Sequence, residues 1–140
     1  MRSNSKPDIS PELKAVIKSS PAIVHKGRYA YLKTKAVPDG NHFMVCKDKD
    51  EITLITEEKK VTKIVHEKSL KWFRLIELKV SAPFPLAKGF LAAVSDAIAS
   101  DGMSIMIVST FSKDYVLIHE EDIEKAIVAL KNLGFRITGN

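Results

Sequence analysis

A short polar segment, STFSKDY at residues 109–115, carries groups that could bind a small molecule. It holds the hydroxyls of Ser109 and Thr110, the ring of Phe111 and the carboxylate of Asp114. A carboxylate can bind an ammonium group, and a hydroxyl can both donate and accept hydrogen bonds. Two interpretations of Asp114 stay open, because aspartate also caps turns by accepting hydrogen bonds from nearby N–H groups.

A second group of candidate residues lies just before and within the first turn of a helix that we predict over residues 86–100. Lys88 can bind an anion, and the free N–H groups of a first helical turn attract one. Gly89 within a helix costs about 1 kcal/mol relative to alanine, so we expect a ligand or a neighbouring backbone close to it. Phe84 and Leu86, in the same stretch, complete the predicted ligand-binding set.

Other residue patterns give no support for catalysis. The four histidines lie far apart in the sequence and lack the spacing of metal ligands (His25, His42, His66 and His119). No phosphate-binding glycine loop, dinucleotide signature or serine elbow is present in the sequence. Consecutive carboxylates at residues 120–122 point apart on a helix, where the helix dipole favours them. We therefore expect no enzyme activity, no metal and no cofactor.

Composition indicates a globular protein. A chain of 140 residues suits one domain or two small packed modules, and its 45% hydrophobic content can form a core. The single cysteine, Cys46, cannot form an intramolecular disulfide, which favours a reducing compartment. The polar start MRSNSKPDIS lacks a signal sequence, and no segment reaches the roughly 18 apolar residues that span a bilayer. We expect a cytoplasmic protein that does not enter a membrane.

The net charge of +5 comes from the first half of the chain. Residues 1–70 hold 14 Lys and Arg against 9 Asp and Glu, whereas residues 71–140 hold 8 against 8. The lysines are dispersed among carboxylates, without an arginine cluster or a base-stacking motif. This pattern favours a solvated surface, so we do not expect nucleic acid as a partner.

The first half predicts one helix and three strands. Ser10 and Pro11 supply an N-cap and a proline at the first helical position, so a helix is predicted over residues 11–19, ending before Pro21. Alternating runs predict strands at 28–34, 42–47 and 51–56. The lysine-rich stretch that follows reads as a linker, with a short strand at 63–66 left open.

The second half predicts strands at 72–80, 103–108, 115–119 and 135–138, with helices at 86–100 and 120–133. Both middle strands are continuous apolar runs, typical of strands buried on both faces. On the first strand, we expect one alternating set to face the core: Trp72, Arg74, Ile76, Leu78 and Val80. The order βαββαβ predicts an α+β, ferredoxin-like antiparallel sheet with both helices on one face and strand order 4-1-3-2.

The sequence resembles ACT domains of the two-ACT family that includes the cytosolic arginine sensors of animals and short, uncharacterised microbial proteins. Trp72, a loop with Pro83 and Gly89, and GMSIMIVSTFSKDYVLIHEEDIEKAIVALKNLGF at 102–135 carry the resemblance. RYAYLKTK and FMVCKDKDEITLIT resemble it more weakly. The resemblance implies an ACT domain at 67–140 and an incomplete ACT-like unit with a leading helix at 1–66. VPDGN replaces the first helix of that unit, which either borrows the helix at 11–19 or uses the second unit's surface.

The resemblance also implies a function. ACT domains commonly bind amino acids at an interface between ACT units, and Asp114 matches an aspartate that contacts the ligand in the arginine sensors. Lys88 departs from the family pattern, so arginine is not carried over as the ligand. We expect a non-enzymatic regulatory protein that binds an amino acid or similar small molecule at an ACT–ACT interface. The alternative is a ligand-free scaffold for oligomerisation or protein binding. A homodimer is expected in both cases, because an exposed sheet edge favours pairing.

Overall fold

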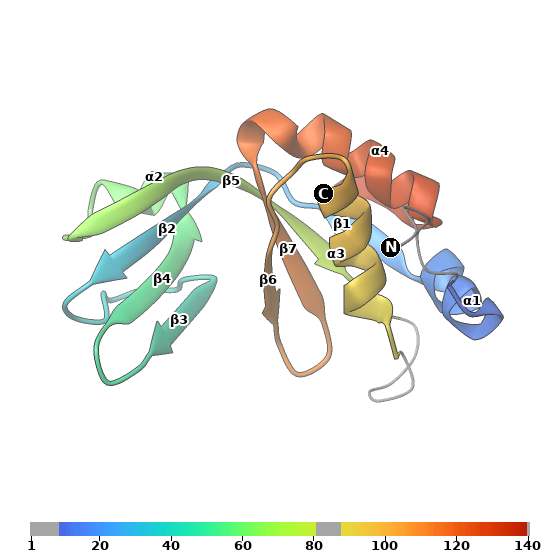
Figure 1. The fold of residues 1–140 in the computed structure, drawn as a ribbon. Coiled ribbons are helices and arrows are strands. Elements are labelled where there is room, and N and C mark those ends of the chain that lie inside the picture. The colour runs from blue at the N-terminus through green and yellow to red at the C-terminus, as the bar shows by residue number, and fades with distance from the viewer. Residues whose placement is uncertain (1–8, 81–87, 140) are drawn as a thin grey trace, which may run out of the picture.

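One long strand, β5 (Lys68–Leu78), runs through an eight-stranded sheet and joins its two parts (Figure 1). The computed structural model describes residues 9–80 and 88–139. Within these ranges, each helix is too short or too polar to cross a membrane. The other strands are β1 (Pro21–Val24), β2 (Tyr29–Thr34), β3 (Met44–Lys47), β4 (Ile52–Glu57), β6 (Met106–Ser109), β7 (Asp114–His119) and β8 (Arg136–Gly139). The helices are α1 (Pro11–Ser19), α2 (Glu58–Val61), α3 (Phe90–Ser100) and α4 (Ile123–Leu133), with the 3₁₀ turn η1 (Glu120–Asp122) before α4.

The second half confirms the ferredoxin-like fold with one change in strand order. β6 pairs with β7, and β7 pairs with β5, all antiparallel, as predicted. The predicted neighbour of β5 on its other side was β8, and this was wrong, because β1 lies between them. β1 is antiparallel to β5 and parallel to β8. From the sequence, Pro21 was interpreted only as the end of a helix. The strand β1 was not predicted, because four residues are too few to show an alternating pattern.

The strands of the first half lie side by side in the order β3-β4-β2-β5, which is the strand order of a ferredoxin-like unit. The first residues of β5 act as the fourth strand, since Leu32 of β2 pairs with Ser69. The segment between β2 and β3, which carries the first helix in a complete unit, forms no helix. Between β4 and β5 the only helix is α2, which has four residues. β5 is therefore shared by a complete unit and by one that lacks most of its helical layer.

Three clusters of buried side chains form the core. The largest lies between the helices and the sheet and includes Ile17, Ile76, Val116 and Leu130, which are all fully buried. The second lies on the opposite face and contains strand residues such as Phe73 and Leu117. The third, under α2, consists of Ala30, Leu32, Leu54, Val61 and Ile64.

Strand β5 contributes to both faces of the sheet. Ile76 and Leu78 face the helices, as predicted for their alternating set. Phe73 and Leu75, predicted to face away from the core, are 4% and 2% exposed because they form the second cluster with β2 and β7. Both alternating sets therefore include buried residues.

Several predicted helix boundaries are confirmed. α1 spans the predicted residues, and the Ser10 hydroxyl accepts a hydrogen bond from the Leu13 N–H at 3.1 Å. α3 ends at Ser100, followed by Gly102 with a φ of 81°, the left-handed conformation that glycine adopts without strain. The predicted helix start at residue 86 lies outside the described residues, and the observed α3 begins at Phe90.

A strand that the sequence left open is absent, and one strand prediction was wrong. The strand left open at 63–66 is not formed, because helical turns continue past α2 and place Ile64 beside Val61 in the third cluster. β6 is not a central strand buried on both faces: it pairs with β7 alone among the described strands, and its residues are partly buried or exposed. Its apolar side chains instead pack on the two faces of the sheet edge, Ile107 toward the helices and Met106 away from them.

Candidate functional site

The hairpin between β6 and β7 brings four of the predicted binding residues together. Ser109 and Asp114 form the last pair of the β6–β7 ladder. The Thr110 N–H donates to the Lys113 carbonyl at 2.9 Å and closes the turn between them. Phe111 stands at the tip and is fully exposed, at 107% of its reference area. The polar stretch is thus a tight hairpin, as predicted, with its only large apolar side chain directed into solvent.

The carboxylate of Asp114 is held at the start of β7. The Ser109 hydroxyl donates to Asp114 Oδ1 at 2.5 Å. Asp114 also pairs in the sheet with Leu78, the last residue of β5, which is fully buried. An ionised carboxylate has about four acceptor positions, so the bond from Ser109 leaves most of that capacity available.

The start of α3 supplies groups of opposite charge. Gly89 is the N-cap residue of α3, with a φ of 83°, and provides no side chain to cap the first turn. The first turn contains no acidic residue, and Lys88, just before it, is exposed. The positive end of the helix dipole and the Lys88 ammonium therefore both favour an anion here.

Gly89 has a structural reason for its identity. The expectation that Gly89 lies inside a helix was wrong, because the helix starts one residue later. A Cβ built on Gly89 would lie 3.4 Å from Leu13 Cδ2 of α1. The positive φ and the close approach of α1 together explain the glycine without a ligand.

The hairpin and the start of α3 lie at the same end of the sheet (Figure 1). This agrees with the register, since Asp114 is opposite the last residue of β5 and the chain leaves β5 in the direction of α3. Two of the predicted binding residues, Phe84 and Leu86, lie outside the described residues. The structure therefore brings together Ser109, Thr110, Phe111 and Asp114 in the hairpin, with Lys88 and Gly89 at the same end of the sheet.

The histidines are bonded to or stacked on other parts of the fold. His25 Nε2 lies 2.9 Å from Glu77 Oε1, and His119 stacks on Phe73 with 4.9 Å between ring centroids. Among the residues that the structure describes, no three His, Cys, Asp or Glu side chains form a group that could hold a metal ion.

Sequence reasoning missed a cavity in the first half of the chain. Its volume is about 710 Å³, and its lining comes from residues 35–42 and 60–67. The lining includes three lysines and two histidines: Lys35, Lys60, Lys63, His42 and His66. One indication of this cavity was present in the sequence, because VPDGN stands where a helix is expected. This indicates that a helix is missing from one layer, but it does not show which residues line the cavity.

Comparisons with known proteins agree with the fold. Residues 74–132 match the family described as ACT domain. No curated protein matches the chain in sequence. A solved Vibrio cholerae protein of unknown function, described as a possible transport protein, is 22% identical with a TM-score of 0.73, covering 88% of this chain and 96% of that one. An Agobacterium tumefaciens protein is 22% identical with a TM-score of 0.67, covering 86% and 93%.

A regulatory protein has the same fold. The regulatory subunit of aspartate kinase from Thermus flavus is 14% identical, with a TM-score of 0.62, and the similarity covers 84% of this chain and 98% of that subunit. At this identity the likeness concerns the fold. The family match over residues 74–132 covers α3, β6, β7, nearly all of α4 and the last five residues of β5, the elements that hold the hairpin and the start of α3 in place. Residues 74–132 are therefore similar to an ACT domain.

Proposed function

We propose that this chain is a cytoplasmic, non-enzymatic regulatory protein that binds a free amino acid or a similar small zwitterion. The site lies between the β6–β7 hairpin and the start of α3. One observation carries the proposal: the partly exposed carboxylate of Asp114 stands at the same end of the sheet as Lys88 and the first turn of α3, whose N-cap residue, Gly89, has no capping side chain. Opposite charges at one end match the two charged groups of an amino acid.

Each charged group of an amino acid has a partner in this arrangement. The ligand's ammonium group would bind the Asp114 carboxylate, whose Oδ1 is already oriented by Ser109. The ligand's carboxylate would accept hydrogen bonds from the N–H groups at the start of α3 and pair with Lys88. The side-chain hydroxyl of Thr110, 3.5 Å from the Lys113 carbonyl, has only a weak contact within the hairpin and is free to turn toward a ligand.

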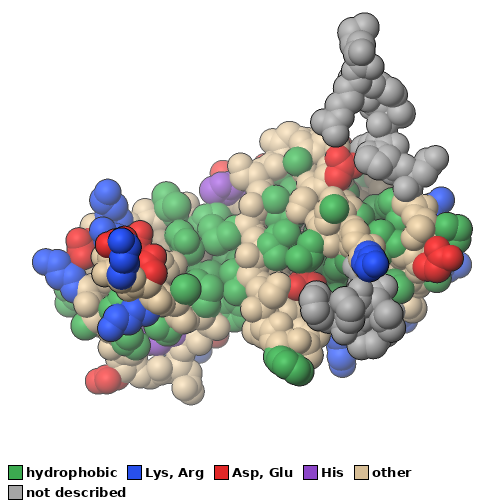
Figure 2. All heavy atoms as spheres, turned by 60° about the horizontal axis from the view of Figure 1, so that its bottom comes forward, with side chains coloured by type: hydrophobic (Ala, Val, Ile, Leu, Met, Phe, Trp, Pro, Cys, Tyr) green, Lys and Arg blue, Asp and Glu red, His purple; other side chains and the backbone are tan. Residues whose placement is uncertain are grey.

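A second ACT unit would complete the site. Phe111 is fully exposed at the hairpin tip, and β6 has no neighbour beyond β7 among the described strands. An exposed strand edge beside an exposed aromatic ring favours pairing with another chain. Figure 2 shows hydrophobic side chains gathered in the middle of the face drawn, with lysines and arginines toward its ends. A homodimer that covers Phe111 and β6 would place the ligand at an interface between ACT units.

The fold supports a regulatory role for the chain. The Thermus flavus regulatory subunit of aspartate kinase has this fold over nearly its whole length.

The single, exposed and unpaired Cys46 fits a reducing compartment such as the cytoplasm.

A thermal-shift screen of the twenty free amino acids tests the proposal. A ligand present at a hundredfold excess over its Kd adds about 2.7 kcal/mol of stability, which gives a visible rise in Tm. We expect at least one amino acid to raise Tm in the wild type and to lose most of this effect in Asp114→Asn. Asp50→Asn is the matched control, since Asp50 is an exposed aspartate in the β3–β4 turn, and it should retain the full shift. An equal shift in all three proteins would place the ligand elsewhere.

The alternative of a scaffold without a ligand is favoured by the same exposed Phe111. Light scattering after size-exclusion chromatography distinguishes the two functions when combined with the thermal screen. A dimer that is lost in Phe111→Ser, with no amino acid changing Tm, supports the scaffold. A ligand-dependent Tm supports the sensor.

A further inference from the structure

The first unit lacks a helix over its sheet, and a cavity occupies that place. Residues 35–43 connect β2 to β3, where a complete ferredoxin-like unit has its first helix. Much of this connection lines the cavity of about 710 Å³, together with residues 60–67 after α2. The third core cluster, which lies under α2, includes one residue of the lining, Ile64. The cavity is thus the space left by the absent helix.

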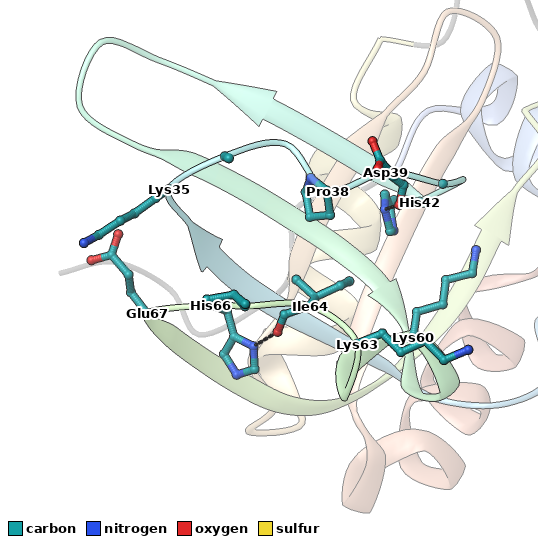
Figure 3. A pocket seen from close by; sticks show the side chains of 12 residues that line it. Lys35, Pro38, Asp39, His42, Lys60, Lys63, Ile64, His66 and Glu67 are labelled. Atoms are coloured by element: carbon teal, nitrogen blue, oxygen red, sulfur yellow. Dashed lines mark hydrogen bonds between the residues drawn. The ribbon is translucent and has the colours of Figure 1, made fainter.

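The cavity has an apolar middle and charged ends (Figure 3). Ile64 points from one wall toward the opposite wall, which carries Pro38. Lys35 and Glu67 stand at one end, and Lys60 and Lys63 at the other. A ligand that fills this space would place an apolar body in the middle and an anionic group at the end with two lysines.

The lysine end has an excess of positive charge. The two carboxylates that precede Lys60 in the sequence have other partners: Glu57 pairs with Lys59 at 3.2 Å, and Glu58 binds Arg28. The cavity lining contains two carboxylates: Glu67 lies at the opposite end, and Asp39 lies beside His42 on the wall that carries Pro38, so two lysines face one carboxylate at the lysine end. An anion bound between Lys60 and Lys63 would therefore meet two ammonium groups.

Hydrogen bonds fix the walls of the cavity. The His42 ring is 2.9 Å from Thr56 Oγ1 through Nδ1 and 3.0 Å from the Asp39 carbonyl through Nε2. The Lys60 ammonium donates to the Asn41 carbonyl and thereby ties the two walls together. His66 Nδ1 lies 2.9 Å from the Ile64 carbonyl and so donates to it. These bonds pre-organise the site, which lowers the entropy cost of binding.

Exposed apolar side chains surround the opening. Val65, in the lining, is 94% exposed, and Val37, between two lining residues, is 53% exposed. Valine is ordinarily buried, and covering such apolar surface stabilises a complex by about 25 cal/mol per Å². The volume also falls within the range of roughly 300–1,000 Å³ that is usual for ligand sites.

We propose that this cavity binds a small organic anion, a carboxylate or phosphate ester with an apolar body. Lys60 and Lys63 bind the anionic group, and Pro38, Ile64 and Val65 contact the apolar body. This site is separate from the β6–β7 hairpin and does not depend on the amino-acid site proposed above, so either can fail without the other.

Matched probes test the requirement for charge and for an apolar body. The ¹⁵N amide signals of the full chain are followed during titration with 3-phenylpropionate, phenyl phosphate and the neutral 3-phenylpropanol. We expect the two anions to shift the amides of residues 35–42 and 60–67, at least tenfold more tightly than the alcohol. Tighter binding of phenyl phosphate than of phenylpropionate assigns a phosphate ligand, and the reverse assigns a carboxylate. Equal affinities for the anions and the alcohol would overturn the proposal.

Variants separate the cavity from ordinary surface lysines. The double variant Lys60→Gln/Lys63→Gln should weaken the anions at least tenfold, whereas Lys59→Gln, whose lysine is outside the lining, should leave them unchanged. Ala36→Trp keeps every lysine and fills the cavity from an exposed lining position, so it should also abolish binding. Retained binding in a folded Ala36→Trp protein would show that the lysines attract anions without the cavity, and would contradict the proposal. Asp114→Asn should have no effect on these probes.

Discussion

The Ser109 hydroxyl donates a hydrogen bond to Asp114 Oδ1 at 2.5 Å, across the last pair of the β6–β7 ladder. This bond orients the carboxylate of Asp114, the first residue of β7. On its other side, Asp114 pairs with Leu78, the last residue of β5. Asp114 therefore has a partner within its own hairpin, and the carboxylate retains acceptor positions for a ligand. Both interpretations of this residue from sequence are compatible, because a bond that stabilises the turn also positions the ligand-binding group.

Replacement of Ser109 by alanine separates these two roles. Removal of an exposed hydrogen bond should lower the free energy of unfolding by about 0.5–1.5 kcal/mol. Affinity for the amino acid should fall severalfold, because Asp114 loses its orientation. Urea unfolding and isothermal titration calorimetry measure the two effects. An unchanged affinity would show that Ser109 serves the turn alone. Ser104→Ala, outside the hairpin, provides the comparison.

Substitution of Gly89 by alanine should destabilise the protein. The φ of 83° costs an L-residue roughly 1–2 kcal/mol, and the new Cβ would lie 3.4 Å from Leu13 Cδ2. Gly139→Ala is the matched control, since a Cβ added there would have no atom within 4 Å and its φ is not positive. Urea unfolding should show a loss of stability for the first variant and little change for the second. Equal midpoints would contradict both causes, the positive φ at Gly89 and the contact with α1.

Arg28 joins the two halves of the chain, and Trp72 reports on it. The guanidinium binds Glu58 and Glu120 and lies 4.4 Å from the centroid of the Trp72 ring. The hydrogen bond that Arg28 donates to Glu58 is the main cause that raises the pKa of Arg28. Because Trp72 is the only tryptophan, Arg28→Gln should change the emission of the protein directly. Added salt should reduce the difference in stability between the two proteins. Arg136→Gln should leave the emission unchanged.

We predict that the phenol of Tyr29 makes the protein less stable at high pH. Burial is the main cause that raises the pKa of its phenol above the ordinary 10.0, with the Glu57 charge contributing. The folded state therefore holds the proton more tightly than the unfolded state. This contribution is fully present below the unfolded pKa and is lost as pH rises through the folded pKa. Between about pH 9 and 11, wild type should lose more stability than Tyr29→Phe in urea unfolding. Parallel curves would contradict this assignment.

The sequence predicts the second half of the fold well because its elements are long and periodic. α3 and α4 each have eleven residues with an apolar stripe, and β7 is a continuous apolar run. The missed strand β1 has only four residues, and its strand conformation depends on pairing with β5 and β8. β5 also begins earlier than predicted, since the polar residues from Lys68 pair with β2, which the sequence pattern does not show. Such contacts between distant segments override local pattern.

The same reason limits what sequence says about the sites. The hairpin was predictable because its residues are contiguous and lie between two apolar runs. The cavity was not, because its walls come from two segments about 25 residues apart that meet only through the fold. The predicted division at residue 66 stays a prediction. α1 and β1, which precede that division, pack in the same core as α3 and α4, which follow it.

Chemical-shift mapping locates the amino-acid site on the full chain. The amino acid that raises Tm most is titrated into ¹⁵N-labelled protein, and the shifted amides are mapped. We expect the largest shifts at residues 109–114 and at the start of α3, around Gly89 and Phe90, and we expect them to disappear in Asp114→Asn. Shifts confined to residues 35–42 and 60–67, or unchanged by Asp114→Asn, would contradict the proposed site.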